Sequence, residues 1–152
     1  MRLIAWDYLS FAMRGVKCDT MQAMKRKLLL LIWILAVIIP TSLLRRVSFS
    51  FRQAFDTIFA PTWLHVLLHG ILFAGLVLLL AYAFSLRLSW YTALILFCIV
   101  LGVGLLQEGF QALEQGFFIF SGALADIGVD FAGGMIGAAL IYGLEMAKSK
   151  AY

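Results

Sequence analysis

The stretch TIFAPTWLHVLLHGILFAGLVLLLAYAFSL, residues 57–86, decides the fold class, because it contains no Asp, Glu, Lys or Arg. About 20 such residues span the hydrocarbon core of a bilayer, and a charge at its centre costs at least about 2.5–3.5 kcal/mol. Further charge-free gaps cover 28–44, 88–107 and 131–144, the last being long enough only if Asp126 and Asp130 lie in its first turns. The sequence predicts four transmembrane helices, over 26–44, 63–85, 89–109 and 126–147.

The composition agrees with a membrane protein. Of the 152 residues, 64% are hydrophobic and 13% are charged, and the mean hydropathy is +1.00. A soluble domain has about a quarter charged residues, so soluble, disordered and disulfide-rich secreted classes are excluded. The net charge of +4 indicates lipid headgroups, and not nucleic acid, as the partner of the basic face.

Lysine and arginine predict the topology. Nine lie before the first span, between the second and third spans, or after the fourth, whereas three lie in the first outer loop and none in the second. By the positive-inside rule, both termini are cytoplasmic. We expect an all-α, multi-pass protein of a bacterial inner (plasma) membrane, with residues 25–152 forming a four-helix transmembrane domain.

Three segments outside the spans are rich in aromatic residues. In residues 1–24, polar side chains recur at steps of three and four, which predicts a cytoplasmic amphipathic helix in the membrane interface; a frayed tail or a partner-binding helix would have the same pattern. The outer loop 45–60 has an interfacial composition. The outer loop 110–125 has Glu114 as its single charge, so we expect it to dip into the outer headgroup region or partly re-enter the membrane.

Strongly polar side chains gather at the outer ends of the predicted helices. His65 and His69 lie in the second span, and Asp126 and Asp130 open the fourth. Each pair is spaced i, i+4 and therefore shares one helix face. The polar cluster is completed by two residues that close the third span, Glu108 and Gln111. It either binds a ligand or is structural, with acids at a positive helix N-terminus and histidines that hydrogen-bond them.

Metal, cofactor and catalytic interpretations have weaker support. Two histidines with carboxylates can ligate a metal, but there is no His-Glu-x-x-His motif and the acids lie on other helices. A paired haem needs histidines on two helices, so we expect no metal and no cofactor. No nucleophile has a matched base, which favours a non-enzymatic role, although general acid/base chemistry by Glu108 or Asp126 with His69 stays open.

Small residues in the fourth span predict close helix packing. Gly133 and Gly137 are spaced i, i+4, and so are Ala139 and Gly143. Small residues allow helix backbones to approach each other in lipid. We therefore expect Gly133, Gly137 and Gly143 to be packing residues, with the fourth helix central in the bundle.

These residues resemble the VanZ-like membrane proteins over about 28–147. The family has Glu-x-x-Gln at the end of its third helix, which Glu108 and Gln111 match. Its fourth helix opens with Asp-x-x-x-Asn-x-x-Gly-x-x-x-Gly, matched by Asp126, Gly133 and Gly137, with Asp130 at the asparagine position. His69, followed by Phe73, fits its second-helix histidine. The family's lysine before that histidine and its arginine ahead of the fourth helix are missing here.

The resemblance implies a small helical bundle with a cell-envelope role, since the member that names the family is linked to resistance against a teicoplanin-type glycopeptide antibiotic. Two hypotheses follow. In the first, the polar cluster binds a lipid-linked or headgroup ligand at the outer leaflet. In the second, the chain is a non-catalytic accessory subunit of a larger membrane complex, with other integral membrane subunits as partners. Membrane lipids are partners in both.

Overall fold

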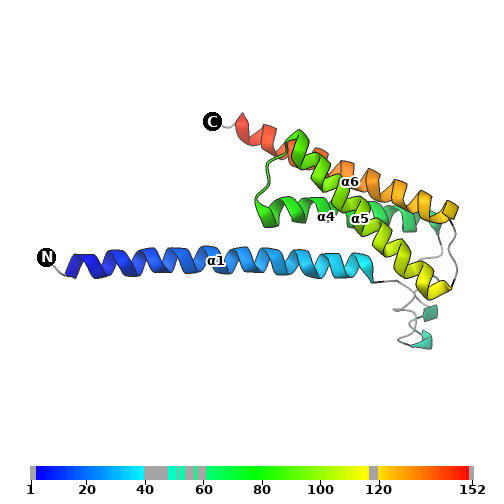
Figure 1. Ribbon diagram of the computed structural model, residues 1–152, viewed down its shortest axis with the longest axis horizontal. Coiled ribbons are helices and arrows are strands. Elements are labelled where there is room, and N and C mark those ends of the chain that lie inside the picture. Colours follow the sequence, from blue (N-terminus) through cyan, green and yellow to red (C-terminus); the bar gives the residue numbers. More distant parts are fainter. Residues whose placement is uncertain are drawn as a thin grey trace.

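Four helices form the described part of the chain. The computed structural model describes residues 3–39, 48–50, 52–53, 57, 61–116 and 120–150, with side chains described from Thr20 onward except at 114 and 115. Within these ranges there is no strand. The helices are α1 (Leu3–Ile38), α4 (Thr62–Phe84), α5 (Trp90–Gln115) and α6 (Phe120–Ser149), arranged as Figure 1 shows. The predicted all-helical class is confirmed.

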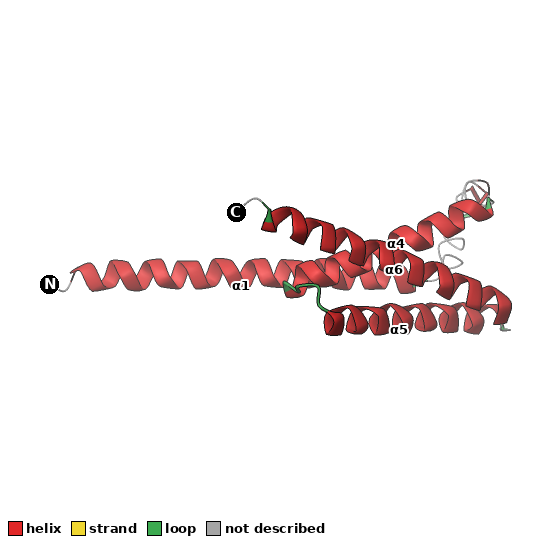
Figure 2. Ribbon diagram, turned by 90° about the horizontal axis from the view of Figure 1, so that it is seen from above, coloured by secondary structure: helices red, strands yellow, loops and turns green. Residues whose placement is uncertain are grey.

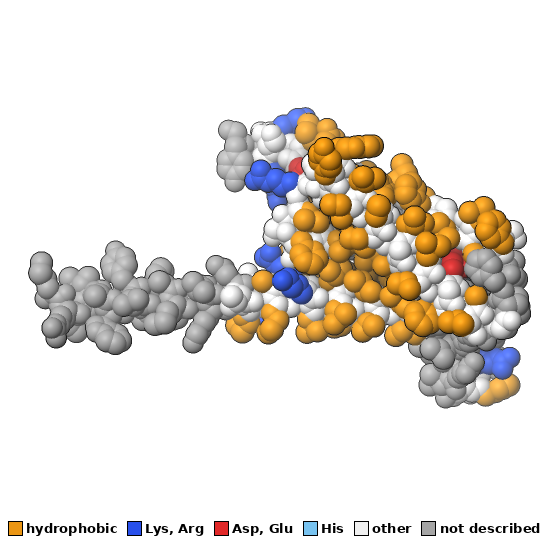
Figure 3. Space-filling view, viewed as in Figure 1, with side chains coloured by type: hydrophobic (Ala, Val, Ile, Leu, Met, Phe, Trp, Pro, Cys, Tyr) orange, Lys and Arg blue, Asp and Glu red, His pale blue; other side chains and the backbone are white. Residues whose placement is uncertain are grey.

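Helices α4, α5 and α6 are long and apolar enough to cross a membrane. Only 28–33% of the residues in their most apolar windows are buried within the protein. The outward side chains are nevertheless apolar, and Figure 3 shows them covering one face of the bundle. A soluble bundle turns such side chains inward, so the chain is a multi-pass membrane protein.

Helix α6 packs most extensively on α4, and the two run in the same direction. Gly133 of α6 meets the backbone of Gly70, and one turn later Gly137 meets Ala74. A Cβ built on Gly137 would lie 2.7 Å from the carbonyl oxygen of Ala74. Both glycines are therefore required for this approach, as the sequence predicted.

The prediction for Gly143 is wrong. This glycine is exposed, and a Cβ built on it has no neighbour within 4 Å among the described residues. Gly134 takes the third place at the contact, since its Cβ would lie 3.1 Å from Val100 of α5 and 3.7 Å from Val77 of α4. Spacing alone cannot separate Gly134 from Gly143, because each lies four residues from an alanine, Ala138 or Ala139.

Helix α1 runs antiparallel to α4. The indole Nε1 of Trp33 donates a hydrogen bond of 2.9 Å to the carbonyl oxygen of Leu72. Nearer the termini, the guanidinium of Arg26 lies 4.6 Å from the ring centroid of Tyr82. The first half of α1 projects past the bundle, and both chain ends lie at the same end of the molecule (Figures 1 and 2).

The leader and the first span form one helix where two segments were predicted. Helix α1 continues through residues 24–26 without a break, whereas a helix that turns into the membrane interface needs a bend at that boundary. The end of the predicted span, 40–44, lies outside the described residues. Both the interfacial leader and the first membrane crossing stay predictions.

The prediction of a long outer loop over 110–125 is wrong. Helix α5 continues to Gln115, and α6 begins at Phe120. Alanine, leucine, glutamate and glutamine are strong helix formers, so the helix persists until Gly116, whose φ of 76° ends it in the left-handed conformation. The loop expected over 45–60 and residues 117–119 lie largely or wholly outside the described residues.

Candidate functional site

The packing of α4 on α6 places each of the two histidines next to one of the two aspartates. Nδ1 of His69 lies 2.8 Å from Oδ1 of Asp130. One turn nearer the start of each helix, Nε2 of His65 lies 3.4 Å from Oδ1 of Asp126. Two parallel helices keep the same offset along their length. When one residue of an i, i+4 pair lies opposite a residue of the other helix, the second residue of the pair therefore lies opposite a residue four positions away. The two rungs form a ladder between α4 and α6.

The two rungs differ in burial. The side chains of His69 and Asp130 are 6% and 2% exposed, whereas those of His65 and Asp126 are 47% and 23% exposed. The ring of Phe73, which is fully buried, stacks on His69 with 6.5 Å between centroids. We call the buried pair of His69 and Asp130 the inner rung, and the partly exposed pair of His65 and Asp126 the outer rung. The inner rung is enclosed by the bundle, whereas the outer rung reaches the surface.

The aspartates do not open their helix, which corrects one sequence-based interpretation. Helix α6 begins six residues before Asp126, and its first turn has no acidic residue. The favourable field of a helix N-terminus fades within the first turn. That field therefore does not explain these acids, and their partners are the two histidines.

Helix α5 completes the site. Gly104 lets it approach Asp130, since a Cβ built there would lie 2.9 Å from Oδ2 of that residue. Glu108, one turn on, is buried and interacts electrostatically with Asp130, Asp126 and His69. Gln111 lies a further turn along, is half-buried, and belongs to neither rung.

Gln107 is a site residue that the sequence analysis missed. It is buried beside Glu108. Gly104, Gln107, Glu108 and Gln111 follow the i, i+3, i+4, i+7 pattern of one helix face. Extending the pattern backwards from Gln111 to Gly104 would have identified Gln107.

Three oxygen atoms in this region are buried without a hydrogen-bond partner among the described residues. They are Oε1 of Gln107, Oε1 of Glu108 and Oδ2 of Asp130. The charged groups that act on Glu108 and Asp130 in the described chain are acids and histidines, with no lysine or arginine. A buried acceptor without a partner costs about 1–3 kcal/mol. A ligand that brings hydrogen-bond donors or positive charge to these oxygens would remove that cost.

Three of the site residues could also bind a metal ion. His65, His69 and Asp126 each offer one ligand atom, and these atoms lie within 4.8 Å of one another. The sequence favours no metal, because it has no His-Glu-x-x-His motif and because the acids lie on other helices than the histidines. The parallel packing of α4 and α6 removes the second of these reasons.

Comparison with known proteins adds no relative: no family model, no curated protein and no solved structure matches the chain.

The chemistry of the exposed and buried polar atoms indicates which ligands the site could bind. Unpartnered carboxylate and amide oxygens accept hydrogen bonds, so they suit hydroxyl groups. A bare anion does not suit a site whose charged side chains are carboxylates.

Proposed function

We propose that this chain is a VanZ-like membrane protein that binds the hydroxyl-bearing headgroup of a lipid or lipid-linked molecule. The observation that carries the proposal is the set of buried, unpartnered acceptors, led by Glu108, beside a rung that reaches the surface. Hydroxyl donors of a headgroup would satisfy these acceptors while its lipid tail stays in the bilayer. His69, Glu108 and Asp126, which carry the family resemblance, are among the residues that converge.

The charge distribution supports an outer-leaflet location. Six basic residues of the described chain lie at the end where the termini lie, namely Lys25, Arg26, Lys27, Arg87, Lys148 and Lys150. Under the positive-inside rule this end is cytoplasmic. The site at the opposite end then faces the outer leaflet of the plasma membrane, and α1 is the fourth spanning helix.

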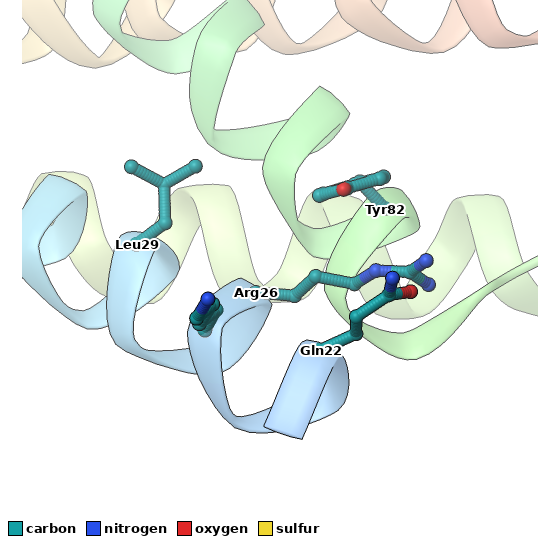
Figure 4. A pocket seen from close by; sticks show the side chains of 5 residues that line it. Gln22, Arg26, Leu29 and Tyr82 are labelled. Carbon is teal, nitrogen blue, oxygen red and sulfur yellow. The ribbon is translucent and has the colours of Figure 1, made fainter. Parts of the chain in front are cut away.

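A basic groove between α1 and α4 supports the same orientation. It has a volume of about 370 Å³ and is lined by Gln22, Lys25, Arg26, Leu29 and Tyr82, as Figure 4 shows. Arginine and lysine with an amide and a phenol suit lipid phosphates, and anionic lipids attract juxtamembrane basic residues by about 1 kcal/mol each. The groove therefore fits a cytoplasmic leaflet rich in anionic headgroups.

The proposal is tested by native mass spectrometry of the protein purified in a mild detergent. Wild type is expected to retain one lipid or lipid-linked molecule with a hydroxyl-bearing headgroup per chain. Glu108→Gln should lose it, because the amide replaces one acceptor with a donor. Glu145→Gln is the matched control, because Glu145 lies at the other end of α6, where its Oε1 accepts a 3.1 Å hydrogen bond from the Leu88 amide.

Two results would refute the headgroup proposal. One is a wild-type protein that retains no such molecule. The other is Glu108→Gln retaining as much as wild type. Loss in both variants alike would also count against this site, since it would show that the change of an acid anywhere in the chain releases the lipid.

A second candidate is the accessory subunit, which the projecting first half of α1 favours. A helix of 36 residues is about 54 Å long at 1.5 Å per residue, well beyond the length of its contact with α4. The projecting part offers a docking element for another subunit. The same purification distinguishes the candidates, because a subunit co-elutes with a fixed set of other membrane proteins, whereas a stand-alone protein elutes with lipid only.

A further inference from the structure

We propose that His65, His69 and Asp126 bind a divalent transition-metal ion, with zinc as the reference metal. This goes beyond the headgroup proposal, because the three ligands and the ion form a site whether or not a lipid is present. Two imidazoles and a carboxylate are a common ligand set for such ions. Three protein ligands leave a fourth position for water or for a hydroxyl oxygen of a ligand.

The distances are close to those of a metal centre. Zinc binds imidazole nitrogen and carboxylate oxygen at about 2.0–2.2 Å, so two ligands of a tetrahedral centre lie roughly 3.3–3.5 Å apart. Nε2 of His65 and Oδ1 of Asp126 are separated by 3.4 Å. The full triad spans at most 4.8 Å between ligand atoms. The side chain of His65 is 47% exposed and its ring lies 4.4 Å from that of His69, so both imidazoles are next to the carboxylate of Asp126.

The inner rung orients one of the ligands. Metal-binding histidines almost always use their second ring nitrogen to contact a carboxylate or a carbonyl, which fixes the ring. Nδ1 of His69 is held 2.8 Å from the buried carboxylate of Asp130. This leaves Nε2 of His69 for the metal. Asp130 is thus a positioning residue, whereas His65 and Asp126 contact the ion.

Besides the geometry of the three ligands, the environment of Glu108 favours a cation at this site. Glu108 is 8% exposed, its Oε1 has no hydrogen-bond partner, and it lies within electrostatic range of Asp126 and Asp130. Buried charges are normally paired or bound to metals. A divalent cation on the outer rung would compensate three neighbouring acids that no described lysine or arginine offsets.

The experiment is isothermal titration calorimetry on wild type in detergent, stripped of metal with a chelator and without added lipid. Zinc is expected to bind with one ion per chain. Magnesium should not bind, because it prefers an octahedral shell of oxygen atoms. His65→Ala and Asp126→Asn should each weaken zinc binding by at least tenfold. Asp130→Asn should weaken it by about 10- to 100-fold, the usual effect of removing the group that orients a ligand.

Glu145→Gln is the control, and circular dichroism checks that every variant keeps its helix content. Because His65 and Asp126 are partly exposed, their variants are expected to fold. Failure of wild type to bind zinc would overturn the proposal, and so would equal binding by His65→Ala, Asp126→Asn and wild type. Either result leaves the headgroup measurement unaffected, because that experiment follows a copurified lipid and this one follows the metal alone.

Discussion

Replacing Gly133 with leucine is expected to destabilise the bundle by about 3 kcal/mol, the upper end of the usual cost of overpacking. A Cβ at this position would collide with the carbonyl oxygen and Cα of Gly70. Backbone atoms cannot move aside as a flexible side chain can, so α4 and α6 must separate. The separation would also open both rungs of the ladder. The measurement is the free energy of unfolding in a titration with a denaturing detergent.

Gly143→Leu is the matched control on the same helix. No atom of the described part of the chain lies within 4 Å of a Cβ built there, and the residue is exposed. Its unfolding free energy should stay within about 0.5 kcal/mol of wild type, as for most surface changes. Equal destabilisation by the two leucines would contradict the packing of α4 on α6 described above.

Replacing Asp130 with alanine is the second change with a large expected effect, about 3–5 kcal/mol in metal-free buffer. It removes the partner of His69 at a point where both side chains are almost fully buried. The imidazole is then left in the core without its hydrogen bond, and a cavity forms against Gly104. The same unfolding titration measures the loss.

Asp126→Ala gives the comparison one turn away on the same face. Its rung is partly exposed, and exposed pairs contribute about 0–1 kcal/mol. We therefore expect a loss below about 1 kcal/mol without metal. Similar losses for Asp130→Ala and Asp126→Ala would contradict the division into a structural inner rung and an open outer rung.

That division gives the two rungs different roles. His69 and Asp130 hold α4 and α6 in register and fix the geometry of the site. His65 and Asp126 keep enough exposure to exchange a ligand. Glu108 reaches the same region from α5, and its Oε1 has no hydrogen-bond partner among the described residues. The two proposals therefore predict that mutations within one ladder separate stability from binding.

The sequence predicted the membrane class and three spans closely, because charge-free runs reflect the low-dielectric solvent directly. The predicted spans 63–85, 89–109 and 126–147 lie within or close to α4, α5 and α6. The ends were less predictable. Residues 110–115 and 120–125 are helical although they lie beyond the predicted spans, because good helix formers continue past the apolar runs. Gly116, and not the end of the apolar run, ends α5.

Contact between the histidines and the aspartates was one of the two alternatives from the sequence, but which histidine pairs with which aspartate could not be predicted. Spacing put His65 with His69 and Asp126 with Asp130, each on one helix face. It gave no information on the register between α4 and α6, which depends on where Gly133 meets Gly70. Without that register, the sequence does not separate a ligand site from acids at a helix N-terminus, and it gives a metal site little support.

The central claim is that α4 and α6 pack in parallel and in register, since every property of the site depends on it. The measurement is disulfide formation between Val77→Cys and Gly134→Cys, with Cys18 and Cys98 changed to serine. A Cβ at Gly134 lies 3.7 Å from Cγ2 of Val77. The Sγ atom of Val77→Cys can take the place of that Cγ2, so a small side-chain adjustment brings the two sulfur atoms within bonding distance. We predict rapid cross-linking under mild oxidation in membranes, read by mass spectrometry. The control pair Val77→Cys and Gly143→Cys should stay reduced. Cross-linking of the control pair, or none in the test pair, would contradict the account.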